Sequence, residues 1–133
     1  MEVRRSPRRA RFPGDFGTFK KAIVGQESGG RYGVPNAQGS GAMGVGQQMP
    51  ATAQALAARL GLPYRPDLMA GADPASRQYQ DAITTAAAQE AWKAGGGNPA
   101  VAAMYYHGGP DRSGWGPKTH AYASQVLARM GAS

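Results

Sequence analysis

The amino-acid sequence predicts a mainly α fold of about five helices around a glycine-rich loop, with little or no β-structure. Apolar residues recur three and four positions apart in several segments, whereas no segment alternates between polar and apolar residues as a half-buried strand does. Prolines stand where these helices would begin, and glycines stand where they would end. The chain has 133 residues and no cysteine, so it is long enough for one domain with its own core, and disulfides are excluded.

The first expected helix begins at Gly14 or Asp15, either of which can cap it. Its apolar stripe includes Phe16 and Ile23. Because successive helical residues advance by about 100°, Glu27 returns to within roughly 20° of Phe16. A carboxyl group on the core-facing stripe, at the carboxyl end of a helix, is disfavoured in its charged form by burial and by the helix dipole. We therefore expect Glu27 to be a general acid; the alternative is an exposed glutamate on a helix that ends one turn earlier.

Four further helices are expected, each beginning with a proline. They run from Pro50 to about Gly61, from Pro74 to about Lys93, from Pro99 to Gly108, and from about Pro117 through Met130. Leu56 and Leu60, four residues apart, share one side of the first of these helices. The proline-containing segment 62–72 is expected to be a loop, and residues 31–34 form at most a short extended piece.

The segment 27–50 holds seven glycines and few charged residues. Glycines at this density suit a backbone that turns sharply and lies close to a ligand. A flexible linker is the alternative, but apolar residues such as Tyr32, Met43 and Met49 argue against it. We therefore expect a ligand-binding loop directly after Glu27.

Basic residues are concentrated at the amino terminus. Residues 4–11 contain five arginines, and Glu2 is the only acidic residue before Asp15. The formal net charge of the chain is +7, but the chain without this arm has only 10 basic and 7 acidic residues. We expect residues 1–14 to be a disordered basic arm and residues 15–133 to be the folded domain. Nucleic acid, anionic lipid or an anionic polymer such as cell wall suits such an arm, and a solvated tail or a fusion remnant explains it equally well.

The side chains available for chemistry favour a carboxylate. His107 and His120 stand alone, without a second ligand at helical spacing, so we expect no metal. The glycines follow a helix and not a strand, which argues against a phosphate-binding loop, and we expect no cofactor. What remains is Glu27. A second carboxylate for glycoside cleavage would be a residue such as Glu90 or Asp111; without one, Glu27 acts first as acid and then as base, and the substrate supplies the nucleophile.

Four segments match one family pattern in order and spacing. Glu27–Ser28 resembles a Glu-Ser pair at the end of a catalytic helix, and residues 41–53 (GAMGVGQQMPATA) resemble a glycine-rich block that runs into the next helix. Residues 106–110 (YHGGP) stand in place of a Tyr-Asn-Ala-Gly-Pro block, and residues 119–122 (THAY) match a Thr-x-x-Tyr pattern. In these blocks the chain resembles the soluble lytic transglycosylase (SLT) domain family, over about residues 16–130. The resemblance implies a lysozyme-like fold.

The resemblance also implies cleavage of the β-1,4 bond between N-acetylmuramic acid and N-acetylglucosamine in peptidoglycan, with a 1,6-anhydromuramic product. In that scheme Glu27 protonates the leaving oxygen and then takes the proton from the muramyl 6-hydroxyl. Ser28 and Tyr106 are expected to support Glu27. The residues expected to contact the sugars are Gln47, Met49, Met43, Tyr32 and His107.

The sequence departs from the family pattern at several positions. His107 replaces the usual asparagine, Gly46 replaces a bulkier residue and could widen a subsite, and the loop before Gly41 is slightly longer. The sequence is more similar to phage-encoded members than to bacterial housekeeping enzymes, so we expect an endolysin or a virion-associated enzyme. We expect it to act as a monomer on glycan strands in the periplasm or cell wall. No apolar run approaches the length of a membrane span, and we expect no signal peptide in this chain.

Two alternatives stay open. A muramidase of the same fold would add water and would need a second carboxylate, such as Glu90 or Asp111. A non-catalytic wall-binding or virion structural module would be held to an anionic polymer by the arginine arm. Nucleic acid is the less favoured partner of the arm, and its binding would weaken steeply with salt.

Overall fold

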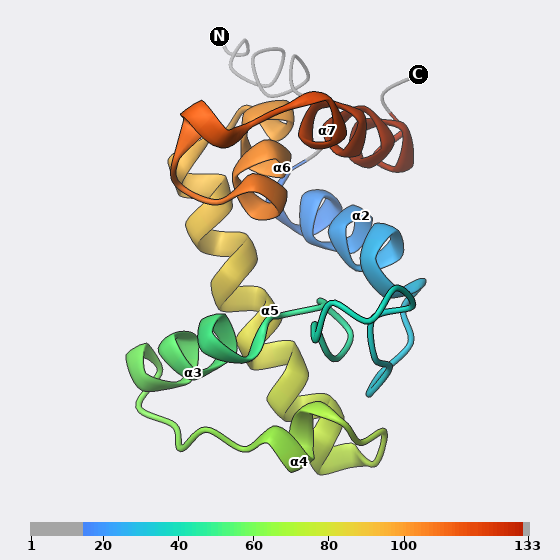
Figure 1. Cartoon of the computed structure of the whole chain (residues 1–133), viewed down its shortest axis with the longest axis vertical. Coiled ribbons are helices and arrows are strands. Elements are labelled where there is room, and N and C mark those ends of the chain that lie inside the picture. Colours follow the sequence, from blue (N-terminus) through green and yellow to red (C-terminus); the bar gives the residue numbers. More distant parts are fainter. Residues whose placement is uncertain (1–14, 132–133) are drawn as a thin grey trace, which may run out of the picture. The chain divides into compact units, whose positions relative to one another are not determined.

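The structure, a computed structural model, describes residues 15–131, so the expected basic arm at residues 1–14 lies outside the described residues. Over this range the fold is mainly α, as predicted, with two isolated β-bridges and no strand (Figure 1). The elements in chain order are α2 (Phe16–Ser28), α3 (Pro50–Arg59), α4 (Pro66–Met69), α5 (Pro74–Ala94), α6 (Pro99–Gly108), the 3₁₀ turn η1 (Arg112–Gly114) and α7 (Pro117–Arg129).

The helix boundaries follow local sequence signals. Each helix from α3 to α7 begins with a proline, because the fixed φ of proline suits the first turn, where its missing N–H would have no partner. The Asp15 carboxylate accepts a hydrogen bond from the Thr18 N–H (3.0 Å), so Asp15, one of the two expected candidates, caps α2. The Asn98 side chain caps α6, where it accepts a hydrogen bond from the Ala100 N–H (2.9 Å). Short α4 was not predicted, since segment 62–72 was expected to be a loop.

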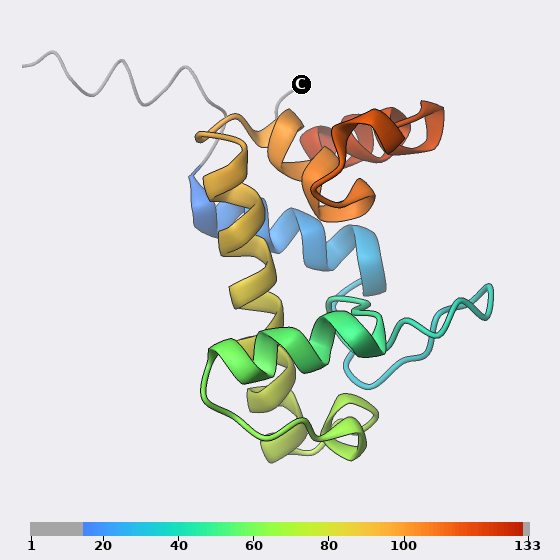
Figure 2. The same ribbon diagram turned by 60° about the vertical axis from the view of Figure 1, so that its left-hand side comes forward.

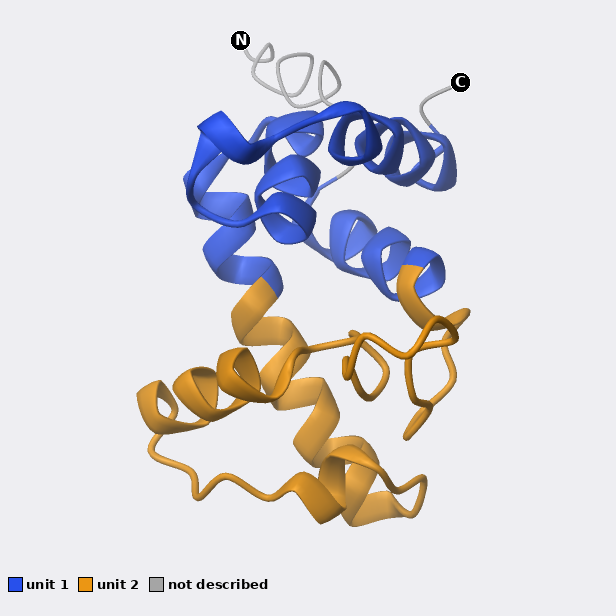
Figure 3. Ribbon diagram, viewed as in Figure 1, with its two compact units in different colours: residues 1–26, 88–133 blue, residues 27–87 orange. Residues whose placement is uncertain are grey.

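The described chain divides into two compact units, which Figure 3 colours separately. Unit 1 comprises the described residues of 1–26 and 88–133, and unit 2 is Glu27–Ala87. The boundaries fall within α2 and α5. Among the described residues, no helix has the length and apolar character needed to cross a membrane.

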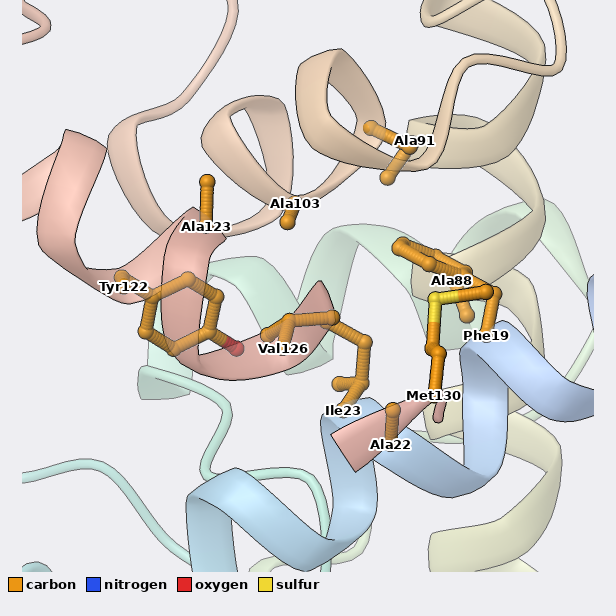
Figure 4. Close-up of a cluster of buried hydrophobic side chains, with 11 residues drawn as sticks. Phe19, Ala22, Ile23, Ala88, Ala91, Ala103, Tyr122, Ala123, Val126 and Met130 are labelled. Carbon is orange, nitrogen blue, oxygen red and sulfur yellow. The ribbon is translucent and has the colours of Figure 1, made fainter. Parts of the chain in front are cut away.

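The core of unit 1 is formed by α2, the end of α5, α6 and α7. Phe19, Ile23 and Val126 are fully buried in it, and alanines of α5 and α6 pack between these larger side chains (Figure 4). The ring centroids of Phe19 and Trp92 lie 5.1 Å apart. Tyr122 and Val126 are buried on the same side of α7, as the spacing predicts.

The core of unit 2 is formed by α3, α4 and the first part of α5. Leu56, Met69 and Ile83 are buried there, and α3 packs on α5 (Figure 2). Leu60, which the pattern places beside Leu56, is instead 44% exposed, because α3 ends at Arg59 and Leu60 lies in the turn that follows.

Candidate active site

Glu27 lies in the last turn of α2. The helix continues to Ser28, and the Glu27 side chain is half-buried. The alternative of an exposed glutamate beyond an earlier helix end is therefore wrong. Gly29 and Gly30 follow with φ of +68° and +84°, a left-handed backbone that glycine adopts without strain, and the chain leaves the helix there.

Ser28 joins the end of α2 to the glycine-rich loop. Its side chain is 3% exposed, and its hydroxyl donates a hydrogen bond to the Val45 carbonyl oxygen at 2.7 Å. The same hydroxyl accepts a hydrogen bond from the Gly30 N–H at 3.1 Å. Because Ser28 immediately follows Glu27, the backbone that carries the carboxyl group is fixed against the loop at Val45.

The loop itself is an ordered structure and not a flexible linker. Met43 and Gln48 exchange two backbone hydrogen bonds of 3.0 Å, and Met43 also forms a bridge with Pro35. In the turn between Met43 and Gln48, Gln47 has a φ of +53°, and its side-chain amide donates to the carbonyl oxygens of Val34 (3.0 Å) and Gly44 (3.1 Å). The amide of Gln47, predicted to contact sugar, therefore stabilises the loop's own backbone.

Gln80 of α5, which the sequence analysis did not predict as a site residue, is hydrogen bonded to the backbone of this loop. Gln80 of α5 is fully buried, and its Oε1 accepts hydrogen bonds from the N–H groups of Gly33 (2.9 Å) and Val45 (3.0 Å). Its Nε2 donates to the carbonyl oxygens of Leu68 and Gly71, both at 2.8 Å. One side chain thus connects the glycine-rich loop with the segment around α4.

Gly33 and Gly46 lie where the loop backbone contacts other elements of unit 2, and neither position has room for a Cβ. A Cβ on Gly33 (φ +72°) would lie 2.5 Å from the Gly71 carbonyl oxygen. A Cβ on Gly46 would lie 2.5 Å from Thr84 Oγ1 and 2.9 Å from Gln48 Nε2. The space beside Gly46, which the sequence suggested as a widened subsite, is occupied by the side chains of Thr84 and Gln48.

The other predicted sugar-contacting residues of unit 2 differ in their surroundings. Met49 precedes α3 and is 45% exposed, whereas Met43 is half-buried and packs against the core of unit 2. The Tyr32 hydroxyl donates to Asp81 at 2.8 Å, and this hydrogen bond raises the pKa of the phenol. The Arg77 guanidinium lies 5.4 Å from the centroid of the Tyr32 ring, so part of this aromatic surface is already covered.

In unit 1, Tyr106 and His107 lie near the end of α6. Tyr106 is half-buried and packs against the core of unit 1. His107 remains exposed overall, but its Nδ1 is hydrogen bonded with Thr119 Oγ1 at 3.1 Å, and its ring lies 4.6 Å from the Tyr122 ring. The partial burial of this ring lowers the pKa of His107. Thr119 and Tyr122 thus anchor His107.

The two candidate second carboxylates, both in unit 1, have local partners. Tyr105 donates its hydroxyl to Glu90 Oε2 at 2.6 Å. Asp111 caps the turn η1, where it accepts from the N–H (3.1 Å) and hydroxyl (2.6 Å) of Ser113, and these hydrogen bonds lower the pKa of Asp111. Within the part of the chain that the structure describes, no three histidine or acidic side chains gather into a set that could hold a metal.

No protein-family model matches this chain, and no curated protein matches it either.

Of the eight predicted site residues, six lie in unit 2 and two in unit 1. The six are Glu27, Ser28, Tyr32, Met43, Gln47 and Met49. The sequence analysis did not predict the buried polar side chains of α5, which are Ser76, Gln80 and Thr84. The one available signal was the spacing of Ser76, Gln80 and Thr84 at every fourth position of α5, which is also the spacing of an ordinary solvent-exposed face.

Proposed function

We propose that this protein is a peptidoglycan lytic transglycosylase with a lysozyme-like fold, in which Glu27 is the single acid/base. The observation that carries the proposal is the local arrangement around Glu27. Glu27 is half-buried in the last turn of α2, and the next residue, Ser28, is hydrogen bonded through its hydroxyl to the glycine-rich loop. This arrangement agrees with the role of the Glu-Ser pair and glycine-rich block in the family that the sequence resembles.

The engagement of the other acidic side chains of unit 2 supports a scheme with one carboxyl group. Asp67 pairs with the Arg65 guanidinium at 2.8 Å, Asp81 accepts the Tyr32 hydroxyl, and Asp73 accepts the Ser76 hydroxyl. These contacts give each of the three a structural role. We therefore assign both proton transfers to Glu27.

The proposed reaction balances without water. Glu27 in its neutral form donates its proton to the glycosidic oxygen as the bond between that oxygen and muramyl C1 breaks. The muramyl 6-hydroxyl oxygen then bonds to C1, and the Glu27 carboxylate takes the hydroxyl proton. The products are a free N-acetylglucosamine hydroxyl and a 1,6-anhydromuramic end, and Glu27 is again neutral.

The composition of the loop and of α3 suits an uncharged polymer. Residues 32–58 contain no acidic or basic side chain, only amides, hydroxyls, glycines and apolar groups. Such a surface can offer hydrogen bonds and apolar contact to sugar hydroxyl and N-acetyl groups. We accordingly propose glycan strands as the substrate, and a cell-wall site of action as an endolysin or virion-associated enzyme.

The test is mass spectrometry of fragments released from purified peptidoglycan by the parent chain and by Glu27→Gln. We expect the parent to release muropeptides that lack a reducing muramic end and are one water lighter than hydrolysis products. Glu27→Gln removes the proton donor and should reduce release by about 10²- to 10⁴-fold. Glu90→Gln, which keeps an oxygen for the Tyr105 hydroxyl, is the matched control and should release fragments at the parental rate.

Each other outcome has a definite meaning. Fragments with reducing muramic ends would show that the chain hydrolyses the bond, as a muramidase does, and loss of activity in Glu90→Gln would identify the second carboxylate. Release by Glu27→Gln at the parental rate would remove Glu27 from the mechanism. Binding without any release by the parent would favour the non-catalytic wall-binding module.

A further inference from the structure

Gln80 uses the full hydrogen-bonding capacity of its side-chain amide inside unit 2. A glutamine oxygen can accept two hydrogen bonds and its nitrogen can donate two. All four are formed, to the N–H groups of Gly33 and Val45 and to the carbonyl oxygens of Leu68 and Gly71. The Gln80 side chain is 0% exposed, so its amide has no contact with bulk water and depends on these four partners.

One of these bonds leads directly to the candidate catalytic residue. Gln80 holds the N–H of Val45 at 3.0 Å, and Ser28 holds the carbonyl oxygen of the same residue at 2.7 Å. Val45 is 2% exposed and is therefore fixed from both sides. Since Ser28 is bonded through its backbone to Glu27, the amide of Gln80 and the carboxyl group of Glu27 are linked through a single residue of the loop.

The packing around the amide leaves little room for adjustment. A Cβ on Gly44 (φ +88°) would lie 3.1 Å from Gln80 Oε1, so the loop backbone rests closely on the amide. The bonds from Gln80 also hold Gly33 and Gly71 where the backbones approach so closely that a Cβ on Gly33 would meet the Gly71 carbonyl. A shorter or apolar side chain at position 80 would leave two N–H and two C=O groups unpaired, and the loop would move to recover them.

We propose that Gln80 is a positioning residue for the reaction of Glu27. It holds the glycine-rich loop at a fixed place relative to the end of α2, so that a bound glycan presents its glycosidic oxygen to the carboxyl group. This inference rests on the proposed function. A misplacement of the substrate by about 1 Å relative to the catalytic group can reduce the rate roughly 10²-fold. We therefore expect a change at Gln80 to lower kcat.

The experiment measures kcat and KM for soluble peptidoglycan fragments with Gln80→Leu, Gln80→Glu and, as the matched control, Gln78→Leu at an exposed position of the same helix. Circular dichroism sets a temperature at which each variant is folded. We expect Gln80→Leu to lower kcat by about 10- to 100-fold with KM changed by less than about threefold, and Gln78→Leu to match the parent.

Gln80→Glu adds a readout that mere loss of stability would not move. At low pH the neutral acid keeps an oxygen for Gly33 and Val45 and donates to one of the two carbonyl oxygens. When ionised, it turns a negative oxygen towards both carbonyl oxygens, of Leu68 and Gly71. We expect kcat of folded Gln80→Glu, relative to the parent, to recover towards low pH, whereas Gln80→Leu shows no such recovery.

The outcomes separate this inference from the proposed function. Suppose that the parent releases anhydro fragments and that folded Gln80→Leu has the parental kcat, with or without a raised KM. Gln80 is then not a positioning residue, and the proposed function stands. If Gln80→Leu does not fold, a Gln80→Glu profile parallel to that of the parent overturns the inference. A parent that releases no fragments overturns both.

Discussion

The hydroxyl of Thr84 is fully buried and has no hydrogen-bond partner among the described residues. It lies against Gly46, where a Cβ would approach to 2.5 Å. A buried hydroxyl without a partner loses its hydration and gains nothing in return. The side chain of Thr84 therefore fills the space beside Gly46, but its unpaired hydroxyl lowers the stability of the folded chain.

We predict that Thr84→Val stabilises the protein by about 1 kcal/mol, because valine has nearly the same shape and removes the unpaired hydroxyl. Urea denaturation of the parent and the variant measures the change. Thr52→Val, at an exposed position of α3, is the control and should change stability by less than about 0.5 kcal/mol. A destabilised Thr84→Val would mean that the hydroxyl has a partner after all.

His107 is a second residue whose chemistry is set by its neighbours. Its ring packs on Tyr122 and bonds to Thr119, and this partial burial places its pKa below the ordinary 6.5. A histidine whose pKa is lower in the folded than in the unfolded chain binds fewer protons when folded. The free energy of unfolding therefore rises with pH around and below 6.5. As the pH falls through this range, the histidine is protonated in the unfolded chain before it is protonated in the folded chain, and the folded chain loses stability.

We predict that His107→Gln flattens the dependence of the unfolding free energy on pH around and below pH 6.5, because the variant lacks the ring whose pKa is lowered by burial. Denaturant titrations at several pH values give the slopes, which are compared instead of the absolute stabilities because the variant also loses the bond to Thr119. A slope in His107→Gln equal to that of the parent would contradict the assignment.

Among the elements, α6 carries Tyr106 and His107 near its end, and its first turn is capped by Asn98. Asn98 accepts hydrogen bonds from the N–H groups of Ala100 (2.9 Å) and Val101 (3.3 Å), which have no partner within the helix. Three glycines, residues 95–97, precede Asn98 and have no side chains that could accept these hydrogen bonds. The side chain of Asn98 therefore supplies the cap.

We predict that Asn98→Ala destabilises the protein by about 1 kcal/mol, since two N–H groups lose their acceptor. Asn98→Ser keeps an oxygen at the cap and should recover most of the difference. Thermal denaturation followed by circular dichroism compares the three proteins. Equal stabilities of the alanine and serine variants would show that solvent satisfies these N–H groups as well as the side chain does.

The helix α5 shows where sequence reasoning reaches its limit. Its start at Pro74 and its end near Lys93 were predicted from the capping pattern and from the glycines that follow, and the structure confirms both to within one residue. Tyr79 and Ile83, four residues apart on one face of the helix, are both buried, as the spacing of apolar residues predicts. The burial of Gln80 and Thr84 was not predicted, because their types are compatible with an exposed helix face.

At the scale of the whole chain, the two units differ in charge and in the way their loops are held. Unit 2 contains four arginines and four acidic residues, so the net positive charge of the chain lies elsewhere. Its glycine-rich loop is held by buried amides and hydroxyls, whereas unit 1 is organised around an apolar core of helices. A neutral unit with a preorganised polar loop fits the uncharged glycan that we propose as substrate.

The sequence by itself determined the helical class, the starts and ends of the long helices, and the place of Glu27 in the last turn of α2. These follow from interactions within a few residues of one another: prolines at first turns, capping side chains, and glycines at helix ends. Only the tertiary structure decided that Gln80 holds Val45, that Thr84 lies against Gly46, and that His107 rests on α7. The partners in these contacts are 12 to 38 residues apart along the chain. A glutamine or threonine bonds equally well to water, so its burial is decided only when the packed backbone brings unsatisfied N–H and C=O groups to it.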